Sequence, residues 1–77
     1  MELTLDCRSG MDELHTQLAE SLDFPCWYGR NLDALHDCLT DLTENLTITL
    51  IEPFRLPGLL HVLEDCAEEN LHIQLIL

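Results

Sequence analysis

Three aspartates lie four residues apart in the middle of the chain, at Asp33, Asp37 and Asp41. If this segment is helical, the three carboxylates line one side of the helix. Each like-charged pair at this spacing costs an isolated helix about 0.2–0.5 kcal/mol, and Asp41 lies near the unfavourable negative end of the helix dipole. Broken local rules of this kind point to function, here the binding of a positively charged partner. A solvated acidic face is the alternative interpretation.

The only tryptophan and the only tyrosine, Trp27 and Tyr28, come just before these aspartates. Aromatic side chains bury a large area at low entropic cost, which suits a recognition surface. A small core also needs large side chains, so one ring could serve each purpose. We expect Gly29 to provide a positive-φ turn between loop and helix, and Arg30 to pair with a nearby acid.

An enzyme built on this segment would need a nucleophile or a metal. Cys38 has acidic neighbours and falls on the apolar side of the predicted helix, whereas a nucleophilic cysteine needs an electropositive setting. For His36, which lies beside acids that favour its charged form, we favour a solvated polar residue over a pH-sensitive contact. Histidines and cysteines show no recognised zinc spacing. We expect no catalytic residue, metal or cofactor, and keep an enzyme using His36, Asp37 and Cys38 as the weakest hypothesis.

The charge balance limits the classes of partner. Fifteen acids and three arginines give the 77-residue chain a formal net charge of −12. Such a surface repels phosphate backbones and anionic lipids, so we expect neither nucleic acid nor membrane as a partner. It also favours solubility, or attraction of a basic protein.

Length and composition favour one small globular domain over residues 1–77, with 47% hydrophobic residues. The N-terminus lacks the pattern of a signal peptide, so we expect a cytoplasmic protein with four free thiols. A monomer is expected, with a dimer as the alternative.

The periodicity of apolar residues predicts six elements in the order strand, helix, helix, strand, helix, strand. They cover residues 2–7, 13–22, a helix that Asn31 caps and Asn45 can end, and then 46–51, 59–69 and 71–77. Asn70 can end the third helix in a left-handed conformation, and the nearly all-apolar last strand is expected to be buried. Strands separated by helices favour a parallel sheet, so the predicted fold is α/β, with three parallel strands covered by three helices on one face.

The segment from Trp27 to Thr40 reads Trp-Tyr-Gly-Arg-Asn-Leu-Asp-Ala-Leu-His-Asp-Cys-Leu-Thr and resembles the barstar family of intracellular ribonuclease inhibitors. A weaker similarity extends to the first helix, the strand at 46–51, and the last helix and strand. The resemblance implies a three-stranded parallel sheet packed with helices. It also implies an inhibitor that plugs the active site of a small basic secreted ribonuclease, with Asp37 standing in for a substrate phosphate.

The resemblance also implies which other residues contact the nuclease. Asp33 matches a second contacting acid, Trp27 an aromatic that stacks at the cleft, and Asp65 and Glu69 match acids of the last helix. The expected partner-binding set is Trp27, Tyr28, Gly29, Asn31, Asp33, His36, Asp37, Asp65 and Glu69.

The sequence departs from the family pattern at several positions. His36 and Leu42 each replace a tryptophan, and Arg30 stands where the type member of the family has an acid. The connection at residues 53–58 is shorter, so we expect a short extra helix to be lost there. Arg30 and His36 motivate the second hypothesis, a barstar-like binding or immunity module for a different, non-ribonuclease toxin or basic protein.

Overall fold

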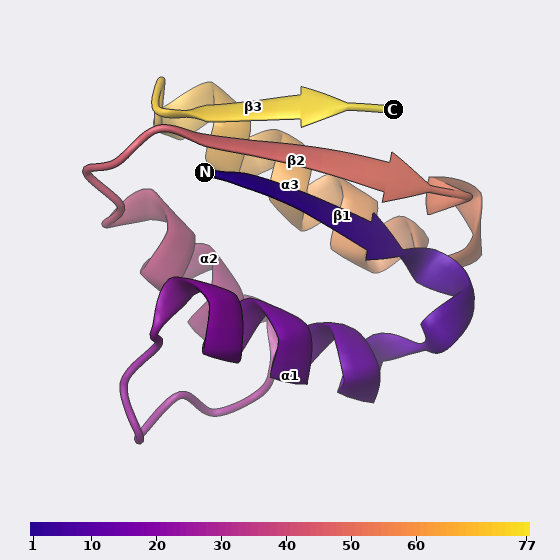
Figure 1. Cartoon of the computed structure of the whole chain (residues 1–77), viewed down its shortest axis with the longest axis horizontal. Coiled ribbons are helices and arrows are strands. Elements are labelled where there is room, and N and C mark those ends of the chain that lie inside the picture. The colour runs from indigo at the N-terminus through magenta and orange to yellow at the C-terminus, as the bar shows by residue number, and fades with distance from the viewer.

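The computed structural model describes all 77 residues and confirms the predicted order of elements (Figure 1). Three strands and three helices alternate as β1, α1, α2, β2, α3 and β3. Their bounds are Glu2–Asp6, Met11–Leu22, Leu32–Thr40, Leu46–Ile51, Pro57–Glu69 and Ile73–Ile76. Two 3-10 turns, η1 at Cys7–Ser9 and η2 at Pro53–Arg55, follow the first two strands. The short connection at residues 53–58 therefore keeps one helical turn.

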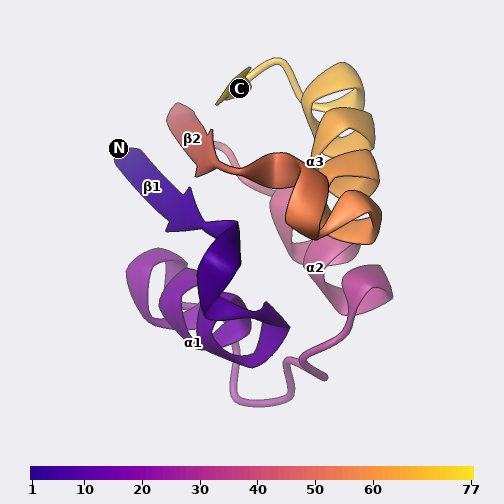
Figure 2. The ribbon, with the colours of Figure 1, turned by 90° about the vertical axis from the view of Figure 1, so that its right-hand side faces the viewer.

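The sheet has the strand order β1-β2-β3, and both pairings are parallel, as predicted. Figures 1 and 2 show the helices gathered on one face of the sheet. Ile48 of the central strand is paired with Leu3 and Leu75, and all three side chains belong to the helix-covered core region. The open face carries polar side chains such as Thr4 and Gln74, which allows a parallel sheet to remain uncovered there.

Thirteen buried apolar residues form the core. Each helix contributes a few side chains from one stripe, and the strands contribute alternate residues, as expected for amphipathic elements. From the helices these are Leu14, Leu18, Leu35, Leu39, Leu59, Leu63 and Cys66. None of the helices has the length and apolar content that crossing a membrane would require.

The last strand differs from its prediction. It covers only four residues, with Ile73 buried and Ile76 exposed. Leu71 and Leu77, predicted to lie in the strand, fall outside it and are exposed. The expectation of a fully buried strand is wrong because no helix covers the second face of the sheet.

The helix ends also shift. Helix α1 begins at Met11 and α3 at Pro57, each two residues earlier than predicted. Proline is well placed at the first position of α3, where no partner for its missing N–H is needed. Helix α2 ends at Thr40, so Asn45 does not end it. Asn45 instead lies in the connection to β2, where its carbonyl accepts a hydrogen bond from the N-terminal ammonium at 2.9 Å.

Candidate functional site

Helix α2 is held with its aspartates outward. The predicted N-cap is confirmed, because the Asn31 side-chain oxygen accepts a hydrogen bond from the Ala34 N–H at 2.8 Å. Leu35 and Leu39 anchor the opposite side of the helix in the core. The stripe of Asp33, Asp37 and Asp41 is therefore exposed, with the Asp37 side chain 83% accessible.

The turn before α2 differs from its prediction at two residues. The positive φ falls on Arg30, at 52°, and not on Gly29. A Cβ at position 29 would lie 2.9 Å from the Asn31 side-chain nitrogen, so a larger residue there would have to shift the side chain that caps α2. Arg30 does not pair with an acid, because its guanidinium donates to the Asp12 carbonyl at 2.8 Å and to the Thr16 hydroxyl at 3.0 Å. The turn is thus fastened to α1.

The two aromatic residues of the loop divide their tasks as the sequence suggested. Trp27 is 74% exposed, whereas Tyr28 packs against the core with its ring 4.8 Å from that of Phe24. The Tyr28 hydroxyl lies 2.5 Å from Nδ1 of the buried His15 of α1. Burial raises the pKa of Tyr28 to about 12. Tyr28 therefore anchors the loop, and the indole of Trp27 remains available to a partner.

Burial of His15 makes the fold sensitive to mild acid. Burial, and secondarily the charge of Arg30, lower the pKa of this histidine. Below about pH 6.5 the unfolded chain takes up a proton at His15, whereas the folded chain takes up this proton only at a lower pH. The free energy of unfolding is therefore expected to fall as the pH drops below about 6.5. Urea unfolding at a series of pH values should show a smaller fall in His15→Gln than in His61→Gln, a matched change at an exposed histidine; equal slopes would contradict this assignment.

Helices α2 and α3 bring further site residues together. Nε2 of His36 lies 2.9 Å from a Glu69 carboxylate oxygen, and Nδ1 lies 3.9 Å from Asp37. The expectation that His36 is simply solvated is wrong, since its side chain is half-buried and joins the two helices. Asp65 lies one turn before Glu69, with His61 at 3.5 Å.

The C-terminal end of α2 is held by Asn70. Its buried amide nitrogen donates to the carbonyls of Leu39, Thr40 and Leu42 at 3.0, 3.4 and 2.9 Å. These carbonyls lie in the last turn of α2 and just beyond it, where carbonyl groups lack helical partners. The backbone of Asn70 is extended, with φ −123°, so the predicted left-handed conformation of this residue is wrong. Asn70 therefore fixes the position of α2 relative to α3.

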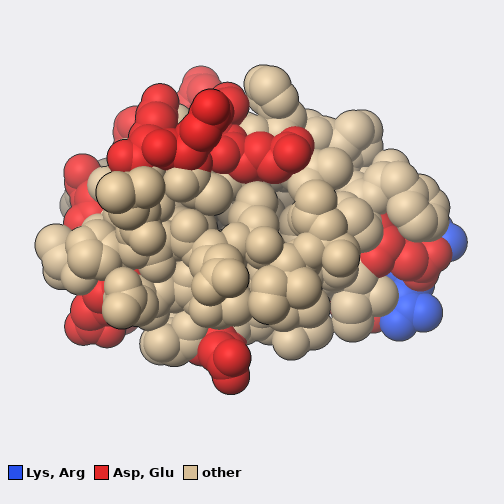
Figure 3. Space-filling view, turned by 90° about the horizontal axis from the view of Figure 1, so that it is seen from above, with Lys and Arg blue, Asp and Glu red and all other residues tan.

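The positive charges lie away from the acidic stripe or are engaged. Arg8 pairs with Asp6 and Glu52 at 2.7 and 3.2 Å, and Arg55 pairs with Glu52. On the face shown in Figure 3, the basic groups lie at one end beside acidic groups, and a larger acidic patch lies toward the other end. Arg30 donates to neutral groups of α1 and keeps its charge, but the three carboxylates of the α2 stripe outnumber this single cation.

The thiol next to Asp37 is poorly suited to nucleophilic chemistry. Burial, followed by the charges of Asp37 and Asp41, raises the pKa of Cys38. The thiol therefore stays protonated near neutral pH, where catalysis would need the thiolate. The arrangement suits recognition of a cationic surface better than catalysis.

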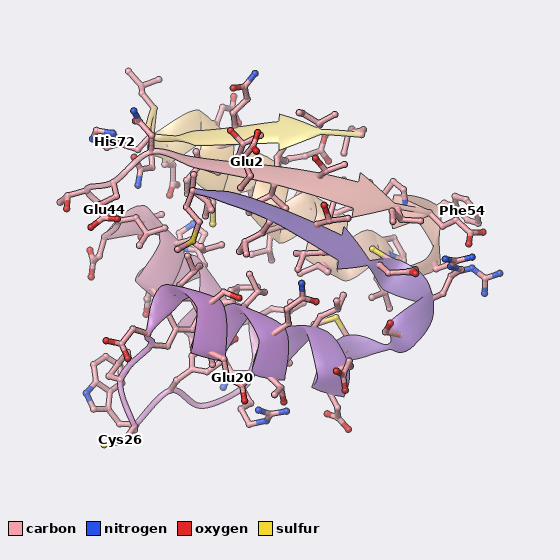
Figure 4. The ribbon with its side chains drawn as sticks, viewed as in Figure 1. Glu2, Glu20, Cys26, Glu44, Phe54 and His72 are labelled. Atoms are coloured by element: carbon pink, nitrogen blue, oxygen red, sulfur yellow. The ribbon has the colours of Figure 1, made fainter.

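The structure brings His36 and Asp37 of α2 close to Glu69 of α3, and it places Trp27 in a hollow that Asp41 also lines. Figure 4 places Cys26, at the tip of the loop, on the same side as Glu44, with Phe54 at the opposite end.

Sequence reasoning missed the supporting roles of His15 and Asn70. For His15, the available signal was its position between the helical leucines at 14 and 18. For Asn70 the sequence offered no signal, because the carbonyl groups that it binds lie about 30 residues away.

Two comparisons with known proteins indicate the family of this chain. The family model described as "Barstar (barnase inhibitor)" matches residues 1–75. A Bacillus subtilis (strain 168) protein named "Putative ribonuclease inhibitor YrdF" is 54% identical over 41 residues. That match covers 53% of this chain and 44% of the relative, so the chain spans less than half the length of the curated protein it resembles.

Proposed function

The chain belongs to the barstar family, and from this premise we propose that it inhibits a small basic ribonuclease by occupying its active site. The carboxylates of Asp33 and Asp37 take the place of substrate phosphates, and Trp27 covers an apolar or aromatic part of the cleft. Tyr28, Gly29 and Asn31 shape the loop that presents these groups. The protein acts by steric occlusion and has no catalytic step of its own.

One observation carries this proposal: an exposed indole lies beside a row of exposed carboxylates on a well-anchored helix. Trp27 is 74% exposed, and neither Asp33 nor Asp41 takes part in an ion pair. Asp37 has only His36, 3.9 Å away. Because both helix and loop are fixed before binding, little ordering entropy opposes association.

The acid residues of α3 extend the same surface. Asp65 and Glu69 lie one helical turn apart, and Glu69 reaches His36 on α2. A basic protein that covers α2 would meet these carboxylates at its margin. Asp65 and Glu69 each contact a histidine. When these histidines are neutral, both carboxylates keep their negative charge and can attract a cationic partner.

Inhibition provides the direct test. A purified small basic ribonuclease of the secreted microbial class is assayed on RNA with increasing amounts of the 77-residue protein. We expect stoichiometric loss of activity and a 1:1 complex by size-exclusion chromatography. Full activity at a large excess of the protein, against several such nucleases, would reject the proposal.

The net charge of −12 leads to a prediction about association kinetics. Exposed charges act over a Debye length of about 10 Å at 0.1 M salt, which shrinks as salt is added. The association rate constant with a basic ribonuclease should therefore fall steeply between about 0.05 and 0.5 M NaCl, with a smaller change in the dissociation rate. Stopped-flow tryptophan fluorescence measures both rates. A salt-independent association rate would argue against electrostatic recognition.

A second candidate rests on His36. Its 2.9 Å contact with Glu69 occupies one of the acids expected to meet the nuclease. A family member with this contact could present a narrower acidic surface, suited to a toxin that is not a ribonuclease. Binding of a basic protein toxin with no effect on any ribonuclease would favour this candidate.

A further inference from the structure

A groove continues from Trp27 toward the N-terminus along the ends of α1 and α2. It consists of two adjoining hollows of about 260 and 340 Å³. The first is lined by Trp27, Phe24 and Pro25, and the second reaches Glu44 and Met1. Both hollows share the same four residues where they meet: Leu22, Asp23, Asp41 and Leu42.

Two helices direct their negative ends at this junction. Helices α1 and α2 both end on this side of the molecule (Figure 1), with Asp23 and Asp41 at their C-caps. Carboxylates are unfavourable beside helix C-termini, where cations are stabilised instead. Neither helix has a basic residue in its last turn to offset this.

Both carboxylates are also free of partners. Asp23 and Asp41 are exposed and take part in no ion pair, although several other acids of the chain do. Asp23 further adopts a left-handed conformation, with φ 55°, in which glycine or asparagine is more favourable. The chain therefore holds two unpaired carboxylates where the two hollows meet, next to the apolar side chains of Leu22 and Leu42.

We propose that this groove binds an arginine or lysine side chain of the basic protein partner, next to the segment that covers Trp27. The aliphatic stem would lie on Leu22 and Leu42 while the cationic group meets Asp23 and Asp41, in the way long basic side chains cover apolar surface. The groove is continuous with the proposed binding surface, since Trp27 lines one of its hollows. The identity of the partner rests on the proposed function, but the chemistry of the groove does not.

The groove can be tested without a nuclease. The 15N-labelled protein is titrated with the dipeptide N-acetyl-Leu-Arg-amide, and with the same peptide carrying neutral citrulline in place of arginine. Amide shifts should concentrate on residues 22–23 and 41–44 with the arginine peptide, and Asp23→Asn/Asp41→Asn should abolish them. The matched variant Glu13→Gln/Glu64→Gln removes two exposed charges elsewhere and should leave the shifts intact. Equal shifts with citrulline, or shifts spread over the whole acidic surface, would overturn the proposal.

A second measurement separates this inference from the proposed function. Against an inhibited basic ribonuclease, Asp23→Asn/Asp41→Asn should raise the Kd by roughly tenfold, and the Glu13/Glu64 control by much less. An unchanged Kd would show that the partner does not use the groove. Localised binding of the arginine peptide by a protein that inhibits no nuclease would reject the proposed function and leave the groove assignment standing.

Discussion

Asp37→Ala is expected to weaken the complex with a basic ribonuclease more than any other single change. In the complex this exposed carboxylate would be enclosed among the cationic groups that normally hold a phosphate. Removing one member of a buried ion pair leaves the other charge unpaired and costs about 3–5 kcal/mol. The Kd should therefore rise by roughly two to four orders of magnitude, as measured by inhibition titration or isothermal calorimetry.

The control for this variant is Glu64→Ala, which also replaces an exposed helical acid by alanine. Glu64 lines a hollow between α3 and β3, away from α2. Both variants should unfold at nearly the wild-type urea concentration, because neither side chain is buried. If the Kd rises equally in Asp37→Ala and Glu64→Ala, Asp37 contributes only through the net charge of the protein. If the Kd is unchanged in Asp37→Ala, Asp37 does not contact the nuclease.

Asn70→Ala is expected to be the most destabilising polar substitution. The amide of Asn70 meets three carbonyls around the end of α2, and its oxygen accepts a hydrogen bond from the His72 N–H at 3.0 Å. Buried polar groups left without partners cost about 1–3 kcal/mol each, so a loss of about 2–3 kcal/mol is expected. This is a large part of the roughly 3–5 kcal/mol that one small core supplies.

Urea unfolding of Asn70→Ala measures this loss, with Asn45→Ala as the matched exposed control. The control should change the free energy of unfolding by about 0.5 kcal/mol or less. If Asn70→Ala does not fold, Asn70→Ser keeps a small polar group and should show a reduced, measurable loss. Because Asn70 positions α2, folded variants should also bind a nuclease more weakly. Equal stability of the alanine variants at positions 70 and 45 would contradict this role.

Local patterns in the sequence were sufficient for much of the architecture. The alternation in Leu46–Ile51 predicted β2 with its observed bounds, and Asn31 predicted the start of α2. Helix–strand alternation predicted the parallel sheet. These predictions succeed because capping and periodicity depend on residues a few positions apart. The acidic stripe on α2 was visible for the same reason.

Contacts between distant segments could not be predicted in this way. The conformation of Arg30 is tied to α1, and the exposure of β3 depends on which face the helices cover. His36 appeared to be a solvated residue until α3 brought Glu69 to it.

The sequence by itself determined the elements, their order, the negative charge and the outward aspartates of α2. The tertiary structure decided what holds that helix and what lies beside it. His15 and Asn70 support the surface from other elements, and Asp23 joins Asp41 only because two helices end side by side. The physical reason is that periodicity and capping are local, whereas burial and pairing across helices arise only when the chain closes around its core.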